Sequence, residues 1–296
     1  MGDPVRHGGQ GRPVLGLLAG SGQFPMLVAS GARQAGCRVV VIALRGEADQ
    51  RLRDLADAFY TSGIVRLGRW IRLFRREGAG QVIMAGRVRK TRVHGSARWL
   101  QWLRYLPDWT SIKVWYFASR DKRNDSLLSA VAEQMQQKGL TVIDSTQYCP
   151  EAMAPEGVLT TASPTASQHK DIELGWRIAK EMGRLDVGQS VAVKEQDVIA
   201  VEAVEGTDAM IARAGELARS GGWTLVKVAK PNQDMRFDVP TVGADTIENL
   251  HRAGGRVLVV EAGKTLLIDR DKTVELANRY GIAVIGRGQG TSAGDA

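Results

Sequence analysis

Short apolar runs alternate with stretches of helical period along most of this chain. Residues 14–19 and 38–44 are runs of strand length made mostly of Val, Leu, Ile and Ala, and residues 24–35 between them carry apolar side chains at helical spacing. Pro25 falls in the first turn of that helix and Gly36 lies just beyond its end, where these residues are favoured. A strand, a glycine turn, a helix and a second strand in this order predict the start of a doubly wound parallel sheet.

The same alternation continues to the end of the chain and predicts an α/β fold in two domains. We expect a Rossmann-like amino-terminal domain with a parallel sheet over residues 14–146, a linker over 147–158 and a second α/β domain over 159–287. Residues 1–13 and 288–296 are expected to be a disordered leader and tail. Further helices are predicted at 63–77, 125–138, 171–182, 207–220, 246–253 and 271–280, and further strands at 81–86, 140–144, 190–202 (a hairpin), 224–229, 257–262, 265–269 and 283–286.

Composition narrows the class of protein. The chain has 296 residues, of which 44% are hydrophobic, and no apolar run approaches the roughly 20 residues of a membrane-spanning helix. Cys37 and Cys149 do not make a disulfide framework in a chain of this length, so a reducing cytoplasm is expected. The four histidines are not spaced for zinc, which makes a hard metal ion bound by carboxylates the expected kind of metal.

Positive charge is concentrated in one part of the chain. The net charge is +8, yet residues 66–104 contain eleven Lys or Arg and a single acid, Glu77. Trp99, Trp102 and Trp109 lie in or near this basic region. Arginine beside tryptophan is typical of a surface that binds nucleic acid, an anionic membrane or an anionic amphiphile. An ordinary solvated helix face is the alternative for part of it.

Two turns of the first domain have the character of an anion site. Gly20, Ser21, Gly22 and Gln23 follow a strand and open a helix, as in phosphate-binding βα turns, although Pro25 breaks the dinucleotide fingerprint. A tight turn without a ligand is the alternative. Arg87 follows the strand at 81–86, at the edge where a doubly wound sheet binds its ligand, and either faces phosphate or belongs to a basic surface turn.

The most unusual composition lies at residues 226–240, where cations and carboxylates interleave after a valine-rich strand. Such a mixture suits an anionic ligand held with a divalent metal, and a salt-bridged strand and turn is the alternative. If the segment is extended, alternation of side chains places Asp234, Arg236 and Asp238 on one face. Lys227 and Lys230 precede them.

Two other segments of the second domain carry polar groups near a helix start. Thr165 belongs to a hydroxyl-rich loop that either binds phosphate or sugar or caps a helix. Glu205, Thr207 and Asp208 lie between a strand and a helix, which Thr207 or Asp208 is expected to cap. Glu202 and Glu205 are acids that capping does not require.

Six segments lie in order along the chain at residues 19–25, 84–88, 186–189, 202–210, 230–240 and 260–263. Together they resemble the UDP-2,3-diacylglucosamine pyrophosphatases of the LpxI type. The resemblance implies a Rossmann-like domain and a distinct second domain with substrate between them. It also implies hydrolysis to UMP and 2,3-diacylglucosamine 1-phosphate in lipid A biosynthesis, a divalent metal (Mg²⁺ or Mn²⁺) and a homodimer. Asn124 departs from the pair of adjacent acids expected at 124–125.

The resemblance and the charge spacing lead to specific roles. Asp234 is expected to be the principal catalytic carboxylate with Asp238 supporting it, and Lys230 and Arg236 are expected to contact phosphate. The predicted metal ligands are Asp234, Asp238, Glu205 and Asp208. The predicted substrate-binding residues are Gly20, Ser21, Gly22, Gln23, Arg87, Thr165, Thr207, Lys227 and Gln233.

The acylated substrate implies work at a membrane face. We therefore expect a cytoplasmic protein that associates peripherally with the inner membrane through its Arg- and Trp-rich region, and no nucleic-acid partner. The two competing hypotheses are a nucleic-acid-binding protein that uses residues 66–104 and an NAD(P)-dependent oxidoreductase suggested by the glycine turn.

Overall fold

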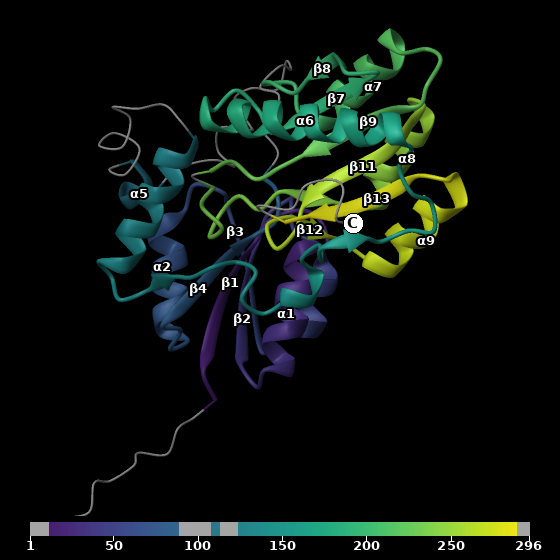
Figure 1. Ribbon diagram of the computed structural model, residues 1–296. Coiled ribbons are helices and arrows are strands. Elements are labelled where there is room, and N and C mark those ends of the chain that lie inside the picture. Colours follow the sequence, from purple (N-terminus) through teal and green to yellow (C-terminus); the bar gives the residue numbers. More distant parts are fainter. Residues whose placement is uncertain (1–11, 89–107, 113–123, 232, 289–296) are drawn as a thin grey trace, which may run out of the picture. The chain divides into compact units, whose positions relative to one another are not determined.

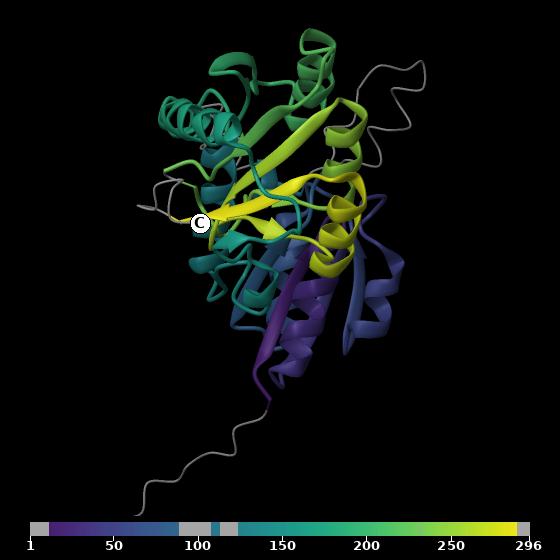
Figure 2. The same ribbon diagram turned by 45° about the vertical axis from the view of Figure 1, so that its right-hand side comes forward.

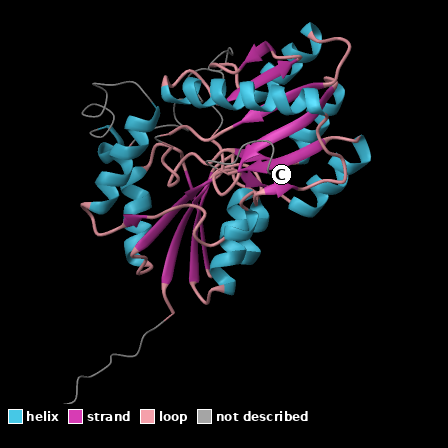
Figure 3. Ribbon diagram, viewed as in Figure 1, coloured by secondary structure: helices cyan, strands magenta, loops and turns pink. Residues whose placement is uncertain are grey.

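The computed structural model describes residues 12–88, 108–112, 124–231 and 233–288 (Figure 1). The chain divides into two compact units, one of residues 1–149 with 235–237 and the other of residues 150–234 with 238–296. Each unit has a sheet with helices against it (Figure 3). The expected α/β fold with two sheets is confirmed.

The sheet of the first unit is entirely parallel. Its strand order, β3-β2-β1-β4-β5, is the Rossmann-like order that the strand and helix alternation predicted. The three central strands are buried on both faces and therefore read as continuous apolar runs in the sequence. The strands are β1 (Val14–Ala19), β2 (Arg38–Leu44), β3 (Ala58–Ser62), β4 (Gln81–Ala85) and β5 (Thr141–Val142).

Helices cover both faces of this sheet. In Figure 1, α1 (Phe24–Gln34) lies on one side, while α2 (Leu67–Arg76) and α5 (Asn124–Gln136) lie on the other. Helix α2 buries Trp70 and Phe74 against the strands, because apolar residues recur at helical spacing along one face of it.

Strand β3 was not predicted. Ala58–Ser62 is an edge strand whose first four residues are only partly buried, so it lacks the long apolar run that marks the central strands. A 3₁₀ turn at Gln50–Leu55 precedes it, with Asp49 as its amino-terminal cap. Without a clear pattern, its pairing with β2 depends on the tertiary fold.

The second unit contains a six-stranded mixed sheet of order β6-β13-β11-β9-β7-β8. Three central strands are parallel, whereas the hairpin at one edge and the short strand at the other are antiparallel to their neighbours. Strands β10 and β12 form a separate, two-stranded parallel sheet. The strands are β6 (Gly157–Val158), β7 (Ser190–Lys194), β8 (Asp197–Val201), β9 (Trp223–Lys227), β10 (Thr241–Val242), β11 (Gly255–Glu261), β12 (Leu266–Leu267) and β13 (Ala283–Arg287).

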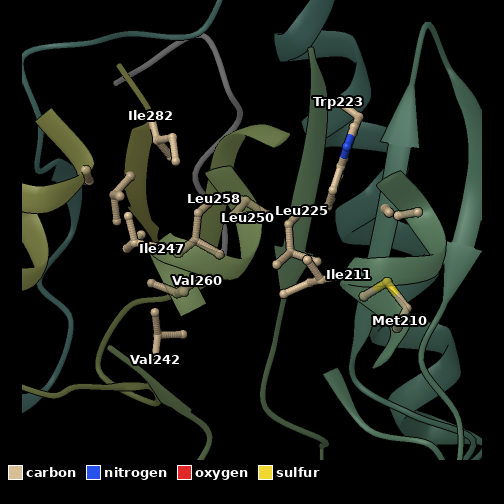
Figure 4. Close-up of a cluster of buried hydrophobic side chains, with 14 of the residues drawn as sticks. Met210, Ile211, Trp223, Leu225, Val242, Ile247, Leu250, Leu258, Val260 and Ile282 are labelled. Carbon is tan, nitrogen blue, oxygen red and sulfur yellow. The ribbon is translucent and has the colours of Figure 1, made fainter. Parts of the chain in front are cut away.

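One long helix covers one face of the second sheet and three shorter helices cover the other. Helix α6 (Ala166–Arg184) buries Ile172 and Ala179 against the valines of the sheet. On the opposite face α7 (Thr207–Leu217), α8 (Ala244–Arg252) and α9 (Arg270–Tyr280) enclose the larger core around Trp223, as Figures 2 and 4 show.

The segment at 147–158, expected as a linker, contains a 3₁₀ turn at Pro150–Ala152 and strand β6, and residues from Pro150 onward belong to the second unit. Cys37 and Cys149 are buried thiols. Among the helices that the structure describes, none combines the length and the apolar character needed to cross a bilayer.

Candidate functional site

Three parallel strands of the second sheet end in charged residues. Lys227, Glu261 and Arg287 are the last residues of β9, β11 and β13, and Glu261 pairs directly with Arg287 in the register. The carboxyl ends of parallel strands form the edge at which α/β proteins bind ligands. This edge is therefore the candidate functional site of the second unit.

The pleat sends these side chains to opposite faces of the sheet. Lys227 has the same parity as Trp223 and Leu225, which pack into the core beside α7 and α8. Glu261 shares its parity with Val257 and Val259, which pack against α6. Two separate polar clusters follow, one on each face.

The first cluster is a hydrogen-bonded chain from Lys227 to Glu202. Lys227 Nζ donates to Thr207 Oγ1 at 3.1 Å and to the carbonyl of Thr241 at 3.3 Å, and Thr207 Oγ1 donates to Glu202 Oε1 at 3.0 Å. Ser190 Oγ lies 3.5 Å from the same hydroxyl. Lys227 and Glu202 are 6% and 8% exposed. Oε2 of Glu202 has no hydrogen-bond partner within the described residues.

The second cluster surrounds Glu261, whose side chain is fully buried. Lys180 Nζ lies 2.8 and 2.9 Å from its two oxygens, and Lys264 Nζ lies 3.1 Å from Oε1. The backbone N–H of Ala229 donates to Oε2 at 2.9 Å. Burial by itself raises the pKa of Glu261, but the hydrogen bonds from Lys180 and Ala229 and the nearby Lys264 outweigh it, so the net shift of the pKa is downward.

Residues 228–240 form a closed loop rather than an extended strand. The N–H of Asp238 donates to the carbonyl of Asp234 at 3.1 Å, and a turn spans residues 235–237. The prediction that Asp234, Arg236 and Asp238 share one face of an extended segment is wrong. The strand ends at Lys227, and Pro231 has no N–H with which to continue a ladder of hydrogen bonds.

Gln233 closes this loop. Its Oε1 accepts from the N–H of Lys230 at 3.0 Å, and its Nε2 donates to Asp238 at both the backbone carbonyl (2.5 Å) and Oδ2 (2.7 Å). The predicted substrate-binding role of Gln233 stays a prediction, and the structure adds a clear reason for a glutamine here. Its amide holds the two ends of the charged loop together.

Lys230 is held by a neighbouring loop. Its Nζ lies 2.6 Å from Oδ1 of Asp186, a residue with a left-handed φ of 56°. The side chain of Lys230 is 26% exposed, so its ammonium is positioned but reachable by solvent. Asp234 is half-buried and Asp238 is exposed. These three residues of the second unit carry the charges that the sequence singled out.

Residues 235–237 belong to the first unit, unlike the rest of the loop. Ser145 donates to the carbonyl of Met235 from both its N–H (3.2 Å) and its Oγ (2.7 Å). Phe237 packs against the core beside α2 and α5, and the guanidinium of Arg236 lies 4.9 Å from the Phe237 ring centre. Arg236 therefore belongs to a part of the loop that is anchored by its neighbours in sequence.

The four predicted metal ligands do not form one centre. In the ranges that the structure describes, no three His, Cys, Asp or Glu side chains gather into a group able to hold a metal ion. Glu205 accepts from the N–H of Ala203 and from Arg213, and Asp208 accepts from Asn249. Hydrogen bonds from its own N–H and from Ala203, with Arg213 beside it, hold the pKa of Glu205 below its ordinary value.

Asp234 and Asp238 remain the donors that fit a hard cation. Mg²⁺ usually takes one or two carboxylates and completes its shell with water and substrate phosphate. Asp234 and Asp238 lie at the two ends of one turn, and Asp238, Glu205 and Asp208 each accept a hydrogen bond from a neighbouring side chain. The metal-binding role of all four stays a prediction.

The glycine turn of the first unit is joined to the next βα turn. The N–H groups of Gly20 and Ser21 donate to the carbonyls of Ala85 and Arg87, each at 2.8 Å, and Arg87 N–H donates back to Ser21 at 2.9 Å. A Cβ at Gly20 would lie 2.6 Å from the carbonyl oxygen of Arg87. Close approach of the two turns, rather than an anion at these two amides, explains this glycine.

The remaining predicted residues have identifiable contacts or lie outside the described part. Thr165 caps α6, with its Oγ1 accepting from the N–H of Gln168. Helix α7 is capped by Gly206, so the expectation that Thr207 or Asp208 caps it is wrong. The side chain of Arg87 is exposed. The side chain of Asn124 and most of the insert at 93–115 lie outside the described residues.

Glu261 and Lys180 were not among the predicted site residues, whereas Glu202 had been singled out as an acid beside Glu205 that helix capping does not require. The signal was available for Glu261, since it lies in a segment that carries the family resemblance, at 260–263. Lys180 sits on a helix with an ordinary amphipathic pattern, so only the fold connects it with Glu261.

Two α/β units, the second with charged side chains gathered where its parallel strands end, define an α/β protein with a candidate ligand-binding edge. The models of two family domains match nearly the whole chain, the LpxI N-terminal domain at residues 14–152 and the LpxI C-terminal domain at residues 155–285. The chain is 35% identical over 281 residues to the UDP-2,3-diacylglucosamine pyrophosphatase LpxI of Caulobacter vibrioides, covering 92% of this chain and 96% of that protein. The chain belongs to the LpxI family.

A solved structure is also similar over part of the chain. It is the biotin carboxylase domain of the Hydrogenobacter thermophilus 2-oxoglutarate carboxylase, 18% identical, which covers 62% of this chain and 35% of its own. The TM-score is 0.24, too low to support any argument about fold or activity.

Proposed function

We propose that this chain hydrolyses the pyrophosphate of UDP-2,3-diacylglucosamine to UMP and 2,3-diacylglucosamine 1-phosphate, a step of lipid A biosynthesis. Family membership supports it, because the curated relative carries the name of this activity. The observation that carries the proposal is the loop at 228–240, which places Lys230, Asp234 and Asp238 just beyond the carboxyl end of β9. The family evidence favours this activity over nucleic-acid binding and over nicotinamide-dependent oxidation.

The charges of this loop suit attack of water on a phosphoryl group. Negative charge increases on the phosphoryl oxygens as water attacks, so catalysis depends on positioning and on nearby cations. Lys230 is already directed by Asp186, and we assign it and Arg236 to phosphate oxygens. Asp234 would orient the attacking water and accept its proton. Asp238 would support the same turn through Gln233.

A divalent metal is part of the proposal. Asp234 and Asp238 would hold Mg²⁺ or Mn²⁺ together with phosphate oxygens of the substrate. A metal bound there neutralises phosphate charge. We assign substrate contacts also to Gly22, Gln23, Arg87 and Thr207.

The test is release of UMP from UDP-2,3-diacylglucosamine by the purified protein in the presence of Mg²⁺. Asp234→Asn should lower kcat by about 10²–10³, the usual loss when one electrostatic contribution to the transition state is removed. Asp197→Asn is the matched control, because Asp197 is an exposed acid of the β7–β8 hairpin. No UMP from the wild-type protein would reject the proposed activity, and full activity of Asp234→Asn would reject only the role of Asp234.

We further propose that the protein is a cytoplasmic homodimer that associates peripherally with the inner membrane. The exposed arginines of α2 and the 70% exposure of Trp109 support a membrane-facing surface. Light scattering coupled to size-exclusion chromatography measures the oligomeric state, and a mass of one chain would reject the dimer.

A further inference from the structure

The loop that carries the proposed catalytic charges is tied to the sheet just after β9 ends. Val228 N–H donates to the carbonyl of Gln189 at 2.9 Å, and Ala229 N–H donates to Glu261 Oε2 at 2.9 Å. Lys230, the first charged residue of the loop, comes immediately afterwards. The position of Lys230 therefore depends on where the backbone of Ala229 is held.

Glu261 is a rigid partner for that amide. It is the last residue of β11, its side chain is fully buried, and both oxygens are engaged by ammonium groups. Lys180 comes from α6, and its Nζ also lies 5.7 Å from the ring centre of Trp176. One carboxylate thus connects β11, α6 and the start of the loop.

An apolar side chain could occupy the place of Glu261 in this part of the core. Its neighbours on the same face, Val257 and Val259, pack against α6 as ordinary apolar residues. A buried ion pair is often no more stable than apolar residues of similar volume, because burying charge costs much of what the pairing gains. Packing alone therefore does not explain a buried carboxylate at this position, whereas an acceptor for the Ala229 amide does.

We propose that Glu261 is a positioning residue of the pyrophosphatase reaction, which holds the Ala229 backbone so that Lys230 and the loop as far as Asp234 keep their place. This inference rests on the proposed function. Lys180 and Lys264 fix the carboxylate in turn. Glu261 does not touch the reacting atoms; it acts only through the loop.

Two substitutions separate positioning from simple charge balance. Glu261→Gln keeps the shape but has a single carbonyl oxygen, which cannot serve both the Ala229 N–H and the two ammonium groups. Glu261→Asp keeps the charge and withdraws the carboxylate by about 1.5 Å, one carbon–carbon bond. The long lysine side chains can follow the shorter carboxylate, but the backbone amide of Ala229 cannot.

Both variants should therefore have a reduced kcat even when they are correctly folded. Hydrogen–deuterium exchange of the peptide 228–234 should be roughly tenfold faster than in the wild type. The kcat should fall by about 10² with KM changed far less, since a small misplacement of catalytic groups can have an effect of that size. Glu77→Gln is the matched control, because Glu77 is also an ion-paired glutamate with low exposure (15%) but belongs to the first unit. It should leave the exchange of this peptide and kcat unchanged.

The outcomes are distinct. If Glu261→Asp has a normal kcat and its loop exchanges hydrogen at the wild-type rate, the positioning role is overturned. Charge balance would then be the function of Glu261. Normal loop exchange in a folded Glu261→Gln protein would overturn it as well. Absence of UMP release by the wild type would reject the proposed function, while the exchange experiment would still report whether Glu261 holds the loop.

Discussion

Gly188 lies directly against the backbone of Glu202. A Cβ built on Gly188 would be 2.0 Å from the carbonyl oxygen of Glu202 and 2.8 Å from its carbonyl carbon. No side chain fits there unless the strand end that carries Glu202 moves. The buried chain from Lys227 through Thr207 to Glu202 thus depends on a glycine in a different loop.

Gly188→Ala should therefore destabilise the protein and reduce its activity. Forcing a methyl group into a filled site typically costs about 1–3 kcal/mol, and here the displaced residue belongs to the candidate site. Urea unfolding and UMP release are the measurements. Gly80→Ala is the control, because a Cβ at Gly80 meets nothing within 4 Å and its φ is not positive. Equal stability of the two variants would contradict the close contact.

Thr207→Val tests the buried hydrogen-bonded chain. Valine keeps the shape of threonine but removes the hydroxyl that accepts from Lys227 and donates to Glu202. Two buried charged groups then lose a partner, so we expect a loss of about 1–3 kcal/mol in the free energy of unfolding. Thr141→Val, at an exposed position of β5, should change it little. A Thr207→Val protein as stable as the wild type would show that the chain contributes nothing.

Acid should unfold the protein through its paired glutamates. Hydrogen bonds from Arg38 and Tyr60 lower the pKa of Glu77, and for Glu261 the lysines and the Ala229 amide lower the pKa against the opposite effect of burial. A carboxyl whose folded pKa lies below its ordinary value of 4.5 stabilises the fold fully above that pH. That stabilisation is lost as the pH falls through the folded pKa.

The free energy of unfolding should accordingly be level above about pH 4.5 and decrease below it. Urea titrations over about pH 3–7 measure this dependence. In Glu77→Gln the free energy of unfolding should decrease less steeply at low pH than in the wild type. If the decrease at low pH is the same in Glu77→Gln and in the wild type, the Arg38–Glu77 pair does not contribute to the pH dependence of stability.

Helix α2 provides the test of membrane association. Its apolar face is buried against the sheet, so Arg69, Arg72 and Arg75 are exposed on the other. Each cation near an anionic surface is worth about 1 kcal/mol, so changing all three to Gln should weaken binding to anionic vesicles by about 10². Co-flotation with vesicles at low ionic strength is the measurement.

The control for this experiment is a triple variant of exposed arginines in the second unit, Arg177, Arg219 and Arg252 changed to Gln. It has the same net charge as the α2 variant and should retain more binding. Equal weakening in both variants would mean that overall charge, and not the face of α2, governs the association. No binding by the wild type would reject a membrane-bound protein.

Much of the fold could be predicted from the sequence because the central strands are buried on both faces. The runs at 14–19, 38–44 and 81–86 are apolar except for Arg38 and Gln81 at their first positions, and the helices between them have a clear period. The edge strand Ala58–Ser62 was missed for the converse reason, since partial burial leaves no such run.

The sequence by itself determined the two α/β halves, the family and the charged loop at 230–240, since these depend on local pattern and on segments contiguous in the chain. Only the tertiary structure decided that the loop is closed by Gln233 and Asp238, and that the Gly20 and Ser21 amides bond to the next turn. It alone joined Lys180 and Ala229 to Glu261, which are 81 and 32 residues away along the chain. Partners so far apart meet only through the packing of helix on sheet, and no local pattern encodes that.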